Sequence, residues 1–181
     1  MTPLGSQMPS FSLLDPVSKK LVSDTDFSTE KPLVVFFICN HCPYVVHIAE
    51  GLAAFSRDYA GRLEMVAINS NDADSYPDDS PEKMVEEVKK RGYVFSYLYD
   101  ESQDVALSFG AACTPDIFVY DKSRKLVYRG QFDAARPGND ASITGESLRG
   151  AVEALLSGKS VAQQQIPSMG CNIKWKAGRV G

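Results

Sequence analysis

An unbroken apolar run, Leu33-Val34-Val35-Phe36-Phe37-Ile38, leads directly into Cys39-Asn40-His41-Cys42, and this junction limits the possible folds more than any other segment. Six consecutive aliphatic, β-branched and aromatic residues predict a strand that is covered on both faces, as in the centre of a parallel sheet. Apolar residues then recur at helical spacing up to about Tyr59, at Val45, Ile48, Ala49, Leu52 and Phe55. The two cysteines therefore lie between a buried strand and an amphipathic helix.

The rest of the chain predicts strands that alternate with helices. Further strands are expected at 11–14 and 20–22, at 63–69, and as a hairpin at 117–120 and 125–129. A helix is expected from Pro81, with Ser80 as N-cap and Gly92 as C-cap. A second is expected at 102–109, and a last one carries Leu148, Val152, Leu155 and Leu156 and ends at Gly158. Residues 70–80 are rich in Asp, Ser and Pro and predict a surface loop. The pattern predicts an α/β fold with a central mixed sheet flanked by helices.

Composition limits the function classes. The 181 residues predict a single domain over 1–181, with its core at about 5–157 and an irregular tail at 158–181 packed against it. A net charge of −4 without a basic stripe argues against a nucleic-acid partner. No apolar run approaches the ~20 residues of a membrane span, and the first residues carry no secretory signal, so we expect no membrane partner and a cytoplasmic location. Four cysteines are too few for a disulfide scaffold.

The dithiol itself indicates exchange chemistry. A cysteine at the N-terminus of a helix is stabilised as the thiolate by unpaired N–H groups and by the helix dipole, and the thiolate is the attacking species in disulfide exchange. From the strand-helix junction we expect Cys39 to attack and Cys42, one turn further on, to resolve the mixed disulfide. This chemistry requires neither a cofactor nor a metal.

His41 lies between the cysteines and would stabilise the Cys39 thiolate further if its ring approaches that sulfur. Because a stabilised reduced form makes a dithiol more oxidising, we expect this protein to be less reducing than thioredoxin. An exposed histidine at a helix start is the alternative interpretation of His41, and His47 is expected to be structural.

With the strand, dithiol and helix in place, residues 5 to 157 resemble the thioredoxin superfamily, and within it the redoxin branch of thioredoxin-like and peroxiredoxin-like proteins. The opening Gly5-Ser6-Gln7-Met8-Pro9-Ser10-Phe11-Ser12-Leu13 is similar to the N-terminal extension of that branch, expected here as a β-hairpin. The segment Cys113-Thr114-Pro115-Asp116-Ile117 matches the family's second motif. The resemblance implies that Pro115 is a cis-proline facing the dithiol and that the Thr114 backbone pairs with a bound peptide.

The chain also departs from the family pattern. Thioredoxin carries a buried acid on the strand before its dithiol, whereas residues 33–38 contain no ionisable group, which leaves Glu50 and Asp116 as weak candidates for that role. Peroxiredoxins place Thr or Ser three residues before the attacking cysteine. If Cys42-Pro43 is aligned with their Cys-Pro, Cys39 occupies that position, so efficient peroxide reduction is not expected.

Two further cysteines complete the candidate site. Cys113 precedes the Thr114-Pro115 motif, and Cys171 lies in the tail next to Trp175, the only tryptophan. We hypothesise that the tail folds back over the active-site face and brings Cys171 towards Cys113 or the dithiol, as a second disulfide or a relay. Packing of a buried Cys171 that anchors the tail is an equal alternative.

Three functions remain open from the sequence. The favoured one is a thiol–disulfide oxidoreductase, with antioxidant activity, that acts on protein or small-molecule disulfides with a thiol reductant, as a monomer or weak dimer. A thiol peroxidase that uses Cys39 or Cys42 is the second. The third is copper or zinc binding, because Cys39, His41, Cys42 and His47 supply soft and imidazole ligands.

Overall fold

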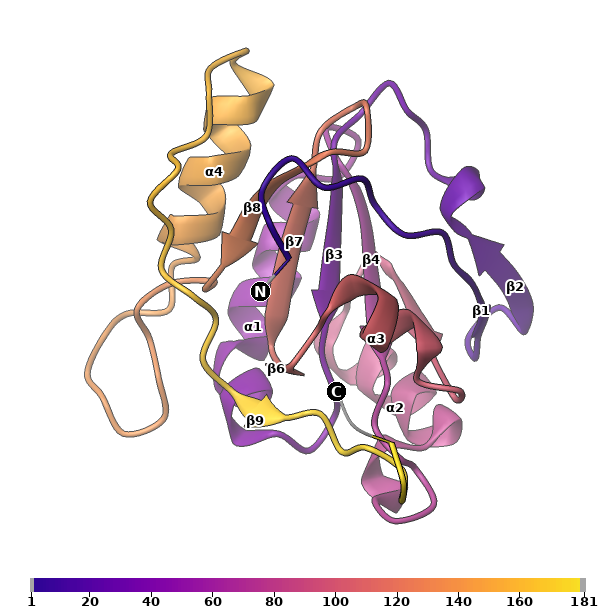
Figure 1. The fold of residues 1–181 in the computed structure, drawn as a ribbon. Coiled ribbons are helices and arrows are strands. Elements are labelled where there is room, and N and C mark those ends of the chain that lie inside the picture. The colour runs from indigo at the N-terminus through magenta and orange to yellow at the C-terminus, as the bar shows by residue number, and fades with distance from the viewer. Residues whose placement is uncertain (1, 180–181) are drawn as a thin grey trace.

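The computed structural model describes residues 2–179, and its ribbon is drawn in Figure 1. The strands are β1 (Ser12–Asp15), β2 (Lys20–Ser23), β3 (Leu33–Phe37), β4 (Glu64–Asn69), β5 (Ser96–Tyr99), β6 (Cys113–Thr114), β7 (Asp116–Tyr120), β8 (Leu126–Gly130) and β9 (Cys171–Asn172). The α-helices are α1 (Pro43–Asp58), α2 (Pro81–Arg91), α3 (Asp104–Phe109) and α4 (Glu146–Leu156), and short 3-10 turns occur at Asp24–Asp26 and Pro77–Asp79. Among these residues, no helix is both long and apolar enough to span a membrane.

Seven strands form one mixed sheet in the order β2-β1-β5-β4-β3-β7-β8. The central strands β3, β4 and β5 run parallel, whereas β7 pairs antiparallel with β3 and with β8. The expected mixed sheet and the N-terminal hairpin, β1 with β2, are therefore confirmed.

Strand β3 lies inside the sheet and divides its side chains between two cores. All five of its residues have no solvent exposure. Val34 and Phe36 pack in one core with residues of α1, α2 and α4. Leu33, Val35 and Phe37 pack in the other with α3 and the N-terminal segment. Figure 1 shows α3 and α1 on opposite faces of the sheet. Alternate residues of a strand point to opposite faces of the sheet. A strand that is covered on both faces therefore has a continuous run of apolar residues in its sequence.

Two expectations about elements were wrong. Strand β5 was not predicted, although Tyr97 and Leu98 are fully buried in it. Residues 70–80 are not simply a surface loop, because Ser70, Asn71 and Asp79 are buried. Their polar groups are paired inside the protein, Ser70 with Asp100 and Asn71 with Asp79. Hydrogen bonding offsets the cost of removing such groups from water.

The tail after α4 runs back along the molecule and contains a strand of its own. In Figure 1 the yellow tail passes β8 and reaches β6. There β9 pairs antiparallel with β6, with Thr114 opposite Cys171 and Cys113 opposite Asn172. Ile173 is 3 % exposed and belongs to the core on the α3 face. The tail packs against the domain as expected, but it is more regular than its composition suggested.

Candidate active site

The dithiol lies where β3 ends and α1 begins. Pro43 is the first helical residue and Cys42 is the N-cap, with φ −63° and ψ 124°. Proline suits the first helical position because it lacks an N–H that would have no partner there. The expectation that Cys39 occupies the helix N-terminus was therefore wrong, since Cys39 precedes the N-cap by three residues.

Thr114 lies between the two sulfur atoms. Its hydroxyl oxygen is 3.4 Å from Cys39 Sγ, and its carbonyl oxygen accepts a hydrogen bond from the Cys42 thiol at 3.1 Å. The Thr114–Pro115 peptide bond is cis, as expected. Both cysteines are reduced and enclosed, Cys39 being 2 % and Cys42 0 % exposed. The structure thus brings the two sequence motifs together.

The two thiols differ in acidity. The interaction with Cys39 is the largest cause that lowers the pKa of Cys42 to about 4. Burial opposes this shift, and contacts with Cys171, with the backbone N–H of Val45 and with Thr114 add to the lowering. The same interaction, together with burial and the charge of Asp79, raises the pKa of Cys39 well above the usual thiol range. A hydrogen bond to the charged form favours that form, so Cys42 is the more acidic of the two thiols.

Asp79 is the buried acid of the site. Its carboxylate is 0 % exposed and accepts hydrogen bonds from the backbone N–H of Asn40 at 2.8 Å, from His41 Nδ1 at 2.5 Å and from the Asn71 side chain at 2.8 Å. These donors satisfy the buried charge. One oxygen of Asp79, one nitrogen of His41 and Cys39 Sγ all lie within 4.8 Å of one another.

Sequence reasoning missed Asp79. Of the two acids considered for this role, Glu50 is exposed on α1, and Asp116 is bound by Arg129 at 2.9 Å. The signal available in the sequence was an Asp/Ser/Pro-rich segment, which does not distinguish Asp79 from the neighbouring Asp78.

Asn40 and His41 organise the turn between the cysteines. The Asn40 side chain donates to the Asp78 carbonyl at 2.9 Å and accepts from Tyr97 at 3.1 Å. The His41 ring is stacked on Tyr76, with 3° between the planes, and its Nδ1 is engaged by Asp79. The ring approaches Cys39, as the sequence allowed, and one of its nitrogens lies within 4.8 Å of the Cys39 sulfur.

The residues considered for metal binding are only partly assembled. Cys39 and His41 come together with Asp79, a set of donors that suits zinc, whereas His47 does not join them. His47 lies along α1, and its Nε2 is buried without a hydrogen-bond partner among residues 2–179.

Both remaining cysteines lie beside the dithiol on the β6–β9 pair. Cys171 is half-buried and hydrogen-bonds with Cys42, and burial together with that bond raises its pKa to about 11. Cys113 contacts the Pro115 carbonyl oxygen at 3.5 Å, and burial together with the charge of Asp116 raises its pKa to about 12. The hypothesis that the tail brings Cys171 to the dithiol is supported by this contact with Cys42.

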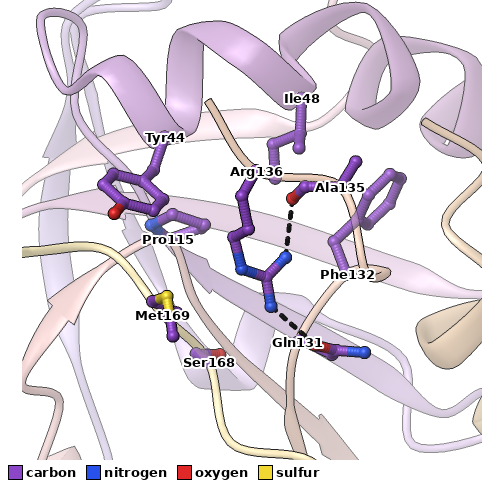
Figure 2. Close-up of a pocket in the computed structure, with 9 residues that line it drawn as sticks. All are labelled: Tyr44, Ile48, Pro115, Gln131, Phe132, Ala135, Arg136, Ser168 and Met169. Atoms are coloured by element: carbon purple, nitrogen blue, oxygen red, sulfur yellow. Dashed lines mark hydrogen bonds between the residues drawn. The ribbon is translucent and has the colours of Figure 1, made fainter. Parts of the chain in front are cut away.

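The tail also closes the surface next to Pro115. A cavity of about 10 Å³ lies next to Pro115. Figure 2 shows Tyr44 and Pro115 among its lining side chains, together with Ser168 and Met169 of the tail. The guanidinium of Arg136 extends along it and donates to Gln131 Oε1 and to the Ala135 carbonyl. A space of this size holds one water molecule.

The chain belongs to the Redoxin family, whose model matches residues 3–146, and this membership places it in the redoxin branch of the thioredoxin superfamily. A search of curated proteins found no match.

Two solved structures of similar length share the whole architecture. A hypothetical protein from Sinorhizobium meliloti 1021 is 52 % identical, with a TM-score of 0.96 and coverage of 98 % of this chain and 97 % of that one. An uncharacterized conserved protein from Geobacillus kaustophilus is 48 % identical, with a TM-score of 0.96 and coverage of 99 % and 95 %. A secreted Mycobacterium tuberculosis disulfide oxidoreductase is 18 % identical, with a TM-score of 0.62 and coverage of 80 % and 96 %, and shares the fold. The thioredoxin-like fold expected from the sequence is therefore confirmed.

Proposed function

We propose that the protein is a thiol–disulfide oxidoreductase in which Cys42 is the attacking thiol and Cys39 the resolving thiol, the reverse of the order expected from the sequence. The observation that carries this proposal is the position of Cys42 at the N-cap of α1, where the neighbouring Cys39 lowers its pKa. Membership of the Redoxin family supports oxidoreductase chemistry in general.

In the first step, which requires β9 to leave the β6 edge because Cys42 is 0 % exposed, the Cys42 thiolate attacks one sulfur of a protein or small-molecule disulfide. A bond forms between Cys42 Sγ and that sulfur, the substrate S–S bond breaks, and the second substrate sulfur leaves as a thiolate. A pKa of about 4 keeps Cys42 ionised at neutral pH, so no proton has to be removed before attack.

In the second step, Cys39 attacks Cys42 Sγ and releases the bound half of the substrate. The high pKa of Cys39 requires a proton acceptor at this point. The Asp79–His41 pair lies within 4.8 Å of the Cys39 sulfur and can take this proton. The products are the Cys39–Cys42 disulfide and the reduced substrate, and a thiol reductant then restores the dithiol.

Trapping distinguishes the two orders of attack. A Cys39→Ser/Cys171→Ser variant incubated with a model disulfide should retain a mixed disulfide on Cys42, because neither neighbouring thiol is left to resolve it. A Cys42→Ser variant should neither form a stable adduct nor catalyse reduction of the disulfide by dithiothreitol.

Peptide mapping by mass spectrometry identifies the modified cysteine, with Cys113→Ser as the matched control that keeps wild-type turnover. A stable adduct on Cys39 of Cys42→Ser would restore the order expected from the sequence. Wild-type turnover by Cys42→Ser would refute the proposed function.

A further inference from the structure

The active site is covered by the chain's own tail. In the redoxin-like arrangement, the strand edge at Thr114 is the place where a bound peptide was expected to pair. Here β9 occupies that edge, with Cys171 directly opposite Thr114. An external partner that pairs with Thr114 would have to displace this strand.

The tail is fixed on both sides of Cys171. Before it, the Ser168 hydroxyl donates to the Gly130 carbonyl at 2.7 Å. After it, the Lys174 backbone N–H donates to the Asn71 side chain at 2.9 Å, and the Lys174 carbonyl accepts from Gln103 at 2.9 Å. Ile173 is buried in the core. Such an anchored segment is part of the folded domain, and its removal would expose apolar surface and buried polar groups.

Cys171 is the one cysteine of the cluster that is both in contact with Cys42 and partly open to solvent. Directly opposed residues on an antiparallel pair have Cβ atoms about 4.5–5.5 Å apart on the same face. Cys171 thus shares its face with Thr114, whose hydroxyl and carbonyl oxygens contact Cys39 and Cys42. Cys113 lies opposite Asn172, one position away.

From this arrangement we propose that Cys171 is a third exchanging thiol, which moves the disulfide from the enclosed Cys39–Cys42 pair to the Cys42–Cys171 pair at the surface. The inference rests on the proposed function. Cys171 loses a proton and attacks Cys42 Sγ, the Cys39–Cys42 bond breaks, the Cys42–Cys171 bond forms, and Cys39 takes up a proton. No net oxidation or reduction occurs in this step.

The new disulfide suits an external thiol reductant. The reductant thiolate attacks the sulfur of Cys171, which is partly open to solvent, and Cys42 leaves as a thiolate. A leaving thiol of low pKa departs faster, and the pKa of Cys42 is about 4. A second thiol of the reductant then releases Cys171 and leaves with the disulfide. Reduction of the protein therefore does not require undocking of the tail.

The first test is disulfide mapping in a Cys39→Ser variant, in which the competing disulfide cannot form. After oxidation with oxidised dithiothreitol and alkylation of the remaining thiols, we expect a cross-linked Cys42–Cys171 peptide and an alkylated Cys113. The double variant Cys39→Ser/Cys113→Ser is the matched control and should keep this link. Alkylated Cys171 beside an oxidised Cys42 would overturn the proposal.

The second test is kinetic and uses the oxidised full-length protein. We expect Cys171→Ser and Cys171→Ala to retain the Cys39–Cys42 disulfide but to be reduced by thioredoxin about tenfold or more slowly, since misplaced reacting groups cost rates of this order. An unchanged unfolding midpoint shows that the tail is still docked. Wild-type reduction rates in both variants would refute the relay. If Cys42→Ser is inactive in the same assay, the proposed dithiol function still stands without the relay.

Discussion

At the scale of single residues, the interaction between the two thiols gives them opposite acidities. Cys42 lies at the N-cap of α1, and Cys39 lies next to the buried charge of Asp79. A bond to the charged form lowers one pKa and raises the other, because the donor must keep its proton. The proposed division into an attacking and a resolving thiol rests on where each sulfur lies relative to the helix start.

The first prediction concerns the pKa of Cys42. Because the bond from Cys39 is the largest cause of its low value, Cys39→Ala should raise the pKa of Cys42 from about 4 towards the ordinary thiol value of about 8.5. The thiolate absorbance of the reduced protein, followed against pH, measures this shift. Cys113→Ser is the control and should titrate like the wild type. A Cys42 that remains ionised at pH 5 in Cys39→Ala would show that another group holds the thiolate.

The second prediction concerns Asp79. Asp79→Asn removes the charge that disfavours ionised Cys39 and leaves the donors of His41 and Asn71 without a full acceptor. We expect a loss of about 1–3 kcal/mol in the free energy of unfolding. We also expect slower release of the mixed disulfide, because the proton acceptor is gone.

Chemical denaturation and the rate of resolution after attack measure these two effects of Asp79→Asn. Asp78→Asn is the matched control, since only the backbone carbonyl of Asp78 contacts Asn40. Equal resolution rates in the two variants would remove Asp79 from the mechanism.

At the scale of elements, the close contact between the tail and β6 depends on Gly170. A Cβ at Gly170 would lie 2.0 Å from the Thr114 carbonyl oxygen and 2.6 Å from its carbonyl carbon. Real Cβ atoms do not approach backbone so closely, so a side chain there forces β9 away from β6. Glycine at this position allows the tail to lie directly on the residue that touches both sulfurs.

The third prediction is that Gly170→Ala uncovers the dithiol. Displacement of β9 should increase the alkylation rate of Cys42 and should lower the stability of the protein. Gly150→Ala is the matched control, because Gly150 lies in α4 with open space around its Cβ position. It should leave the alkylation rate unchanged. Identical rates in the two variants would mean that the tail does not control access to Cys42.

Short-range patterns in the sequence predicted most of the helices and strands. Where these patterns failed to predict a feature, there is a physical reason. The β3 run, the α2 caps Ser80 and Gly92 and the β7–β8 hairpin each carry their own short-range signal. Strand β5 does not, because its four residues are placed by pairing with β4. The dithiol and Thr114-Pro115 were recognisable as motifs. Asp79 was not recognisable from the sequence, because only the tertiary fold buries its side chain.

At the scale of the whole molecule, the protonation states of the site fix how the redox potential depends on pH. The expectation that this protein is less reducing than thioredoxin remains a prediction, and it now rests on the acidity of Cys42 rather than on Cys39 and His41. A stabilised thiolate favours the reduced form, so the potential should lie between about −270 mV, the value for thioredoxin, and about −120 mV.

The fourth prediction is the slope of that potential. Between about pH 4 and the pKa of Cys39, reduction of the Cys39–Cys42 disulfide takes up two electrons and one proton, because Cys42 stays ionised. The potential should then fall by about 30 mV per pH unit, half the value of about 59 mV for a couple that takes up two protons. Equilibration with glutathione buffers at several pH values, followed by alkylation and mass measurement, determines the slope. Cys171→Ser isolates the Cys39–Cys42 couple from the relay, and a slope near 59 mV in that variant would show that Cys42 is protonated at neutral pH.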